Sequence, residues 1–184
     1  MLMLLGLMTA ATAQAQAAPQ RLAVSTTICS NSPIPAGWVV IGSYSTSSCA
    51  GAGYIYTIAN ATNLTSITVC SISPIPAGWV VTGSYTTSTC AGTGYAYTLM
   101  KLTTQSNATV CSFSPIPTGW VITGSYTTST CAGTGYAYTL ANTANLTSTT
   151  VCSFSPIPAG WVVTGSYGTG TCAGSNIAYT IRRA

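Results

Sequence analysis

Eight cysteines are the residues of this chain whose type and spacing point most directly to a chemistry. They form two series with a spacing of 41 residues, one of Cys29, Cys70, Cys111 and Cys152 and one of Cys49, Cys90, Cys131 and Cys172. Zinc sites built on cysteine need close pairs such as Cys-x-x-Cys, whereas the nearest cysteines here are 20 positions apart. An even number of widely spaced cysteines is typical of a disulfide framework. We therefore expect structural disulfides and no metal site.

Two pairings of these cysteines are compatible with the spacing. The first joins cysteines 20 positions apart, as Cys29–Cys49, Cys70–Cys90, Cys111–Cys131 and Cys152–Cys172. The second joins Cys49–Cys70, Cys90–Cys111 and Cys131–Cys152, and it leaves Cys29 and Cys172 single unless the chain closes into a ring. A strand is expected before the first cysteine and after the last, so each whole copy brackets two cysteines. This favours the first pairing, although connectivity does not follow from sequence alone.

The side chains on which most enzymes depend are missing. The 184 residues contain no Asp, no Glu and no His, so neither ordinary general acid–base catalysis nor a Ser-His-Asp or Cys-His nucleophile can be assembled. Carboxylate-based calcium loops are excluded on the same ground. A serine activated by Lys101 is the one remaining route, and this lysine occurs in a single copy. We expect neither an enzyme nor a cofactor.

Charge is almost absent. Charged residues make up 2% of the sequence, against ~25% in ordinary proteins. The four cations, Arg21, Lys101, Arg182 and Arg183, give a net charge of +4. Nucleic acids require a clustered basic face, so we expect no nucleic-acid partner.

The beginning of the chain has the pattern of a secretory signal peptide. An apolar run over residues 1–8 is followed by small residues with Ala-x-Ala patterns. We expect a signal peptide over residues 1–17, with cleavage after Ala17, and a short N-terminal segment over 18–25. The apolar run is shorter than the ~20 residues of a spanning helix, so no membrane span is expected after cleavage. The localisation predicted is secreted, which covers the extracellular space, the cell surface and the periplasm.

The rest of the chain consists of four copies of one unit. The repeats are expected at 26–66, 67–107, 108–148 and 149–184, and no copy has gained or lost a residue relative to another. Over 32 positions the second and third copies differ at three, Ile72/Phe113, Ala77/Thr118 and Val81/Ile122. Equal spacing is expected if each copy packs on the next, although recent duplication would also produce it. A ring, a rod and flexible beads all remain open.

Each copy has the signals of three β-strands. In copy two, a short strand leads into Cys70, a long strand runs from Trp79 to about Thr87, and a third begins at Tyr95. Strict alternation along the long strand places Trp79, Val81, Gly83 and Tyr85 on one face. The predicted fold is all-β, with four tandem disulfide-linked repeats, each a three-stranded antiparallel meander, stacked in order.

The aromatic residues suggest a core and a candidate ligand surface. The four tryptophans and the tyrosines Tyr56, Tyr97, Tyr138 and Tyr179 are expected to supply the core, because aromatic side chains bury the largest apolar area. The position shared by Tyr54, Tyr95 and Tyr136 is the better candidate for a platform on which sugar rings stack. Copy four has Ile177 there, so a buried phenol with a fixed partner is not expected.

The connectors between copies are polar and contain four Asn-x-Ser/Thr sites, at Asn60, Asn63, Asn107 and Asn145. In a eukaryotic secretory protein these would be glycosylation acceptors on exposed loops. We favour the simpler interpretation that Asn and Thr are present because they suit turns.

The repeated pattern P-I-P-x-G-W-V, G-S-Y and Cys is similar to short tandem repeats of uncharacterised secreted bacterial proteins. This resemblance spans the whole chain after the leader and implies secretion, but no activity and no site residues. We expect a secreted, non-enzymatic structural or adhesive protein of the extracellular matrix or cell surface, whose partner is another copy of itself. The alternative is a carbohydrate-binding, lectin-like module whose partner is a cell-surface polysaccharide. Binding to ice is a weaker alternative, because the threonine spacing is not regular over enough residues.

Overall fold

The computed structural model describes residues 24–184, which form four three-stranded antiparallel sheets and contain no helix. The expected signal peptide lies outside the described residues. The strands of the first two repeats are β1 (Ser25–Cys29), β2 (Trp38–Ser45), β3 (Tyr54–Asn60), β4 (Ser66–Cys70), β5 (Trp79–Thr86) and β6 (Tyr95–Lys101). Those of the last two are β7 (Asn107–Cys111), β8 (Trp120–Thr127), β9 (Tyr136–Asn142), β10 (Ser148–Cys152), β11 (Trp161–Gly168) and β12 (Ile177–Arg183). The prediction of an all-β fold with repeated three-stranded units is confirmed.

The order of strands within each sheet differs from a meander. In repeat 2 the order is β4-β6-β5, so the third strand lies in the middle and pairs with both others. A meander needs a tight turn between its first two strands, but residues 71–78, with two prolines, separate β4 from β5. This extended segment carries the chain from one edge of the sheet to the other, because proline fixes extended backbone and removes ladder donors.

The long strand contains a bulge that changes which residues share a face. Val81 pairs with Leu99 and Gly83 with Thr98, so Thr82 is an extra residue in the ladder. A bulge shifts the alternation by one position. The expected face of Trp79, Val81, Gly83 and Tyr85 is therefore wrong beyond Val81. Ser84 is buried on the same side as Trp79, and Tyr85 is exposed.

All four disulfides join cysteines of the same repeat. They are Cys29–Cys49, Cys70–Cys90, Cys111–Cys131 and Cys152–Cys172, with Cα–Cα distances of 5.4–5.7 Å. The favoured pairing is confirmed and the alternative through Cys49–Cys70 is wrong. Each bond ties the end of the first strand to the loop between the second and third.

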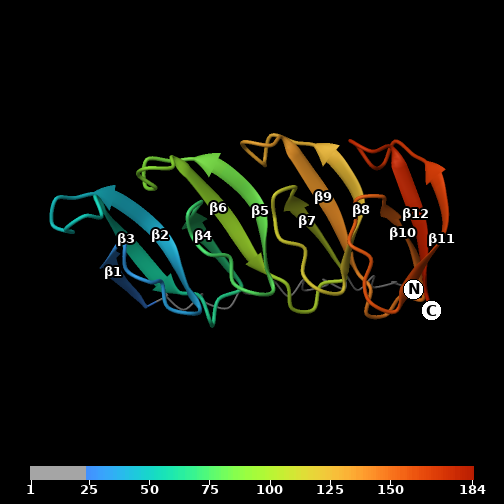
Figure 1. Ribbon diagram of the computed structural model, residues 1–184, viewed down its shortest axis with the longest axis horizontal. Coiled ribbons are helices and arrows are strands. Elements are labelled where there is room, and N and C mark those ends of the chain that lie inside the picture. Colours follow the sequence, from blue (N-terminus) through green and yellow to red (C-terminus); the bar gives the residue numbers. More distant parts are fainter. Residues whose placement is uncertain (1–23) are drawn as a thin grey trace, which may run out of the picture.

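The four sheets follow one another in an open row, with repeat 1 and repeat 4 at opposite ends (Figure 1). Strand contacts between repeats join consecutive repeats only, through β2 and β4, β5 and β7, and β8 and β10. Of the three arrangements that the sequence left open, the structure shows a rod.

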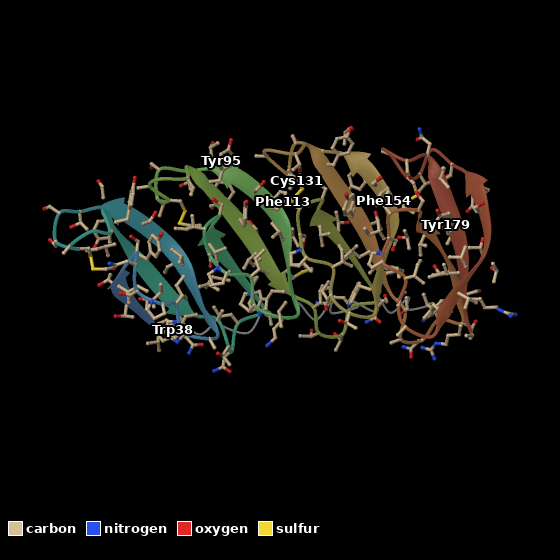
Figure 2. The ribbon with its side chains drawn as sticks, in the orientation of Figure 1. Trp38, Tyr95, Phe113, Cys131, Phe154 and Tyr179 are labelled. Carbon is tan, nitrogen blue, oxygen red and sulfur yellow. A yellow bond between two sulfur atoms is a disulfide. The ribbon has the colours of Figure 1, made fainter. Side chains whose placement is uncertain are left out.

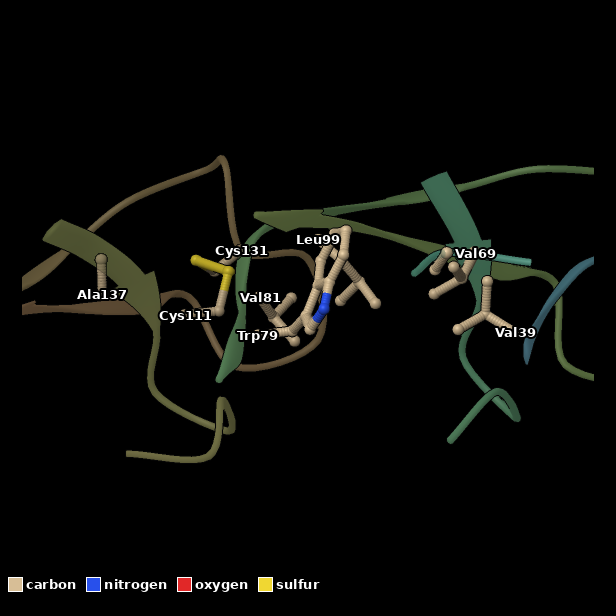
Figure 3. Close-up of a cluster of buried hydrophobic side chains, with 9 residues drawn as sticks. Val39, Val69, Trp79, Val81, Leu99, Cys111, Cys131 and Ala137 are labelled. Carbon is tan, nitrogen blue, oxygen red and sulfur yellow. A yellow bond between two sulfur atoms is a disulfide. The ribbon is translucent and has the colours of Figure 1, made fainter. Parts of the chain in front are cut away.

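Neighbouring repeats share one hydrophobic core at each junction. Between repeats 2 and 3, the side chains of Trp79, Val81 and Leu99 belong to the same buried cluster as the Cys111–Cys131 disulfide and Ala137 (Figure 3). A single three-stranded sheet has no second layer of its own, so it must bury its apolar face on a neighbour. The disulfide of one repeat thus forms part of the floor on which the preceding repeat packs. Burial of Trp79, Trp120 and Trp161 agrees with the expected core. The other aromatic residues expected there are only half-buried, namely Trp38, Tyr56, Tyr97, Tyr138 and Tyr179.

Four hydrogen bonds join the long strand of each repeat to the repeat that follows it. At the junction of repeats 2 and 3, the Ser84 amide donates to the Thr130 carbonyl (2.9 Å) and the Ala132 amide to the Ser84 carbonyl (3.4 Å). The Ser84 hydroxyl donates to the Ala132 carbonyl (2.8 Å), and the Val81 amide donates to Ser114 Oγ (2.9 Å). The same four bonds recur at the other two junctions, 41 residues away in each direction.

Replacing Trp79 by alanine should remove the centre of a junction core. We expect Trp79→Ala to lower the free energy of unfolding by about 3–5 kcal/mol, the usual cost of truncating a buried aromatic residue. Denaturant unfolding followed by circular dichroism measures this change. Tyr85→Ala is the control, because Tyr85 lies on the same strand but is exposed and should change stability by no more than about 0.5 kcal/mol. An unchanged unfolding midpoint for Trp79→Ala would contradict the core assignment.

The serine before the Pro-Ile-Pro segment should matter only where a repeat precedes it. Ser114→Ala leaves the buried Val81 amide without its acceptor, so we expect a loss of about 1–3 kcal/mol of stability. Ser32 is the equivalent residue of repeat 1, which no other repeat precedes within residues 24–184. Ser32→Ala at low protein concentration should therefore be nearly neutral. Equal losses in the two variants, measured by denaturant unfolding, would show that the junction bond is not the cause.

Candidate functional site

The described residues offer no cluster of side chains that could hold a metal ion. No group of three or more His, Cys, Asp or Glu side chains that could hold a metal ion occurs within residues 24–184, and all eight cysteines are in disulfides. Lys101, the one amine considered for activating a serine, donates from Nζ to the Thr62 carbonyl at 3.4 Å. The amine of Lys101 therefore lies against a connector.

The three tyrosines predicted from the sequence occupy equivalent places on one edge of the rod. Tyr54, Tyr95 and Tyr136 are the first residues of β3, β6 and β9. The side chains of Tyr95 and Tyr136 are 39% and 42% exposed, which leaves their rings available to a ligand. Figure 2 shows Tyr95 at this edge, above Phe113 of the next repeat.

Two hollows lie beside these tyrosines, each at a junction. The first, of about 350 Å³, is lined by Tyr95, Tyr97, Phe113, Ala132, Gly133 and Thr134. The second, of about 280 Å³, is lined by Ser112, Tyr136, Tyr138, Phe154, Ala173, Gly174 and Ser175. Each hollow is built from the third strand of one repeat and the loops of the next. The two are copies of one another, related by the 41-residue repeat.

The floor of each hollow is a pair of aromatic rings from two repeats. Tyr97 and Phe113 have ring centroids 4.9 Å apart, and Tyr138 and Phe154 have centroids 5.4 Å apart. Such tilted pairs add stability beyond their buried area. The sequence identified Tyr97 and Tyr138 only as core residues and did not assign Phe113 or Phe154 to a site. The signal available was the Ile72/Phe113 difference between two otherwise matching copies.

The first junction differs because Tyr54 covers the glycine that faces it. A Cβ atom added to Gly92 would lie 3.3 Å from Cζ of the Tyr54 ring, whereas Cβ atoms added to Gly133 or Gly174 would meet nothing within 4 Å. The glycine therefore lies beneath an aromatic ring at one junction and borders open space at the other two. Of the three predicted tyrosines, the structure places two in open hollows and the third over Gly92.

The chemistry of the two hollows is that of a neutral aromatic surface. Tyrosine and phenylalanine faces provide apolar contact, while hydroxyl groups and backbone carbonyls provide hydrogen bonds. No charged residue lines either hollow. A ligand that depends on a salt bridge has no partner here, whereas a neutral ring with hydroxyl groups has both contacts that it needs.

The asparagines of the connectors behave largely as turn residues. Asn60 Oδ1 accepts a hydrogen bond from the Thr62 amide, a common device of asparagine in turns. Asn63, Asn107 and Asn145 are exposed. Whether any of the four carries a glycan stays a prediction.

Comparisons with known proteins place the chain in no family: no family model, no curated protein and no solved structure matches it. Within residues 24–184, no helix is long and apolar enough to cross a membrane. The assignment of function therefore depends on the chain's own residues.

Truncating the exposed Tyr95 should change stability much less than truncating Phe113 beneath it. Tyr95→Ala should change the free energy of unfolding by at most about 0.5 kcal/mol, because the side chain is largely at the surface. Phe113→Ala removes half of an aromatic pair at a junction and should cost about 1–3 kcal/mol. Thermal unfolding of the two variants measures the difference. A large loss in Tyr95→Ala would assign this tyrosine to the fold rather than to a ligand surface.

Proposed function

We propose that this protein is a secreted, non-enzymatic structural or adhesive component of the extracellular matrix or cell surface. The observation that carries the proposal is the continuous row of four disulfide-linked sheets, in which the same four hydrogen bonds recur at every internal junction. A rod whose repeats are joined by the same bonds along its length has a defined extended shape, which suits a scaffold.

Composition supports the same role. Disulfides persist in oxidising compartments, and four of them indicate that the folded protein works outside the reducing cytosol. The surface is almost uncharged and rich in Ser, Thr and exposed Tyr. Such a surface lacks the long-range repulsion that keeps like molecules apart, so it can adhere to neutral surfaces and to copies of itself.

The direct test is to locate the protein in the cells that make it. Antibody labelling of intact cells and of their shed matrix should find the protein outside, in oxidised form. Cells that lack the protein should lose adhesion or matrix cohesion and regain it when the intact chain is restored. Labelling confined to the cell interior would overturn the proposal.

A second candidate function is carbohydrate binding, and the open hollows beside Tyr95 and Tyr136 favour it. Two equivalent sites on one rigid rod can engage one polysaccharide together, and this raises apparent affinity well above that of each site. The test is retention on insoluble neutral polysaccharides. The double variant Tyr95→Ala/Tyr136→Ala should lose retention, while the matched variant Tyr85→Ala/Tyr126→Ala keeps it, because Tyr85 and Tyr126 are exposed but line neither hollow.

A further inference from the structure

We propose that copies of this chain associate head to tail, with the exposed edge strand β11 of one copy docking on the outer face of repeat 1 of the next. The joint between copies would repeat the joint found three times within the chain. The inference rests on the proposed structural function, since it names the partner and the contact from which an extended assembly would grow.

The first observation is an apolar strand that is covered in every repeat except the last. Val121 and Ile122 of β8 are 0% and 2% exposed beneath repeat 4. The equivalent residues of β11, Val162 and Val163, are 44% and 49% exposed. The tryptophan at the start of the strand remains buried at both places, so the difference lies in the covering repeat. β11 thus presents the half of a junction that nothing in the described chain completes.

The second observation concerns hydrogen-bonding groups at this edge. Ser125 pairs with Tyr138 inside its sheet, and its amide and hydroxyl bond outward to repeat 4. Ser166 pairs with Tyr179 in the same register, so its amide and carbonyl face away from β12 in the same way. The Val163 amide likewise corresponds to the Ile122 amide, which donates to Ser155 Oγ. An edge strand with such outward groups is a template for another chain.

The matching half-junction lies at the other end of the rod. Repeat 1 has the serine before Pro-Ile-Pro, Ser32, and the disulfide Cys29–Cys49 with Ala50 beside it. No described repeat precedes it, and β1 is exposed over Ser25–Thr27. Three of the four junction bonds use backbone groups of the receiving repeat, so they need its backbone shape rather than particular side chains. The fourth needs only Ser32.

Several side chains on the receiving face of repeat 1 differ from those of the internal junctions. Ser48 stands where Thr89, Thr130 and Thr171 stand, and two other positions change more in volume. Ile55 stands where Ala96, Ala137 and Ala178 stand, and Asn31 stands where Ile72, Phe113 and Phe154 stand. Phe113 packs on Tyr97, and Ala137 belongs to the same cluster. Ile55 is larger than the alanine it replaces, and Asn31 is smaller than the phenylalanine it replaces. The total side-chain volume on which Tyr179 of another copy would pack therefore changes little.

Charge decides between head-to-tail and tail-to-tail association. Arg182 pairs with Val162 at the edge of the exposed face, and the chain has no acidic residue to neutralise it. Joining two β11 edges would bring like charges together, whereas residues 24–60 of repeat 1 carry no charge. Met100 occupies the place of Arg182 at an internal junction and is only half-buried. A side chain of that length can therefore keep its charged end in water.

Sedimentation velocity of the oxidised protein over a wide concentration range tests the proposal. We expect polymers whose mass rises without limit, because a head-to-tail contact leaves one end of each kind free. Val163→Lys should weaken association roughly tenfold or more, since it buries an unpaired charge in the joint. Tyr167→Lys is the matched control: it adds the same charge to the same strand, at a place whose equivalents stay exposed beside internal junctions. It should associate normally. Both variants should unfold as the parent does, because both side chains are exposed.

Variants of repeat 1 test the other half of the joint. Ile55→Lys should also prevent growth, and a mixture of Ile55→Lys with Val163→Lys should stop at dimers, each using its one intact end. The double variant Asn31→Phe/Ile55→Ala should associate at least as well as the parent, because it restores the phenylalanine and alanine found together in repeats 3 and 4. A monomer at all concentrations, a dimer insensitive to Ile55→Lys, or loss of association in the double variant would overturn the inference.

These outcomes are separable from those for the proposed function. If the purified protein forms polymers but labelling is confined to the cell interior, head-to-tail association is supported and the structural role outside the cell is overturned. If the protein is labelled at the cell surface but stays monomeric, the role outside the cell is supported and head-to-tail association is overturned.

Discussion

The contact between the tryptophan face of one repeat and the disulfide of the next is the interaction on which the rest of the structure depends. A three-stranded sheet is one layer, and neither of its faces is closed by the sheet itself. Cys111 and Cys131 are almost completely buried in one cluster with Trp79 and Leu99. In repeat 1, which no other repeat precedes within the described residues, Cys49 is still buried but Cys29 is half-exposed. The disulfide holds its own repeat together and provides the surface on which the preceding repeat packs. The same atoms therefore stabilise both the single repeat and its contact with the neighbouring repeat.

Much of this fold could be predicted because the repeat displays its constraints in every copy. The strands expected before the first cysteine and after the last favoured the correct pairing, as in Cys70–Cys90, and the strand signals predicted three strands per copy. The order of the strands could not be predicted, since it depends on how β6 pairs at long range and not on any local signal. The bulge at Thr82 was missed for a similar reason: an extra residue in a ladder is defined by the partner strand, and a threonine is unremarkable in a strand on its own.

The candidate site was predicted in part. Comparing copies indicated Tyr95 and Tyr136 as unburied aromatic residues, and the structure places both beside hollows. The hollows themselves could not be predicted from the sequence, because each exists only between two repeats. Each depends on how Phe113 or Phe154 lies against a tyrosine of the preceding copy. The serines that close the junctions, such as Ser84 and Ser114, were present in all four copies without being recognised. Their role in joining the repeats could be recognised only once it was known which strand edge faces which loop.

The position of the disulfides also sets how far the molecule can be stretched. Each bond encloses a 20-residue separation within a 41-residue period, so a repeat pulled open at its ends releases only about half of its length. At ~3.4 Å for each extended residue, every repeat that unfolds under force adds roughly 70 Å of extended chain. Reduction would approximately double that extension. A tether made of such repeats is therefore short and stiff while oxidised, and its mechanical reach is governed by the redox state of its surroundings.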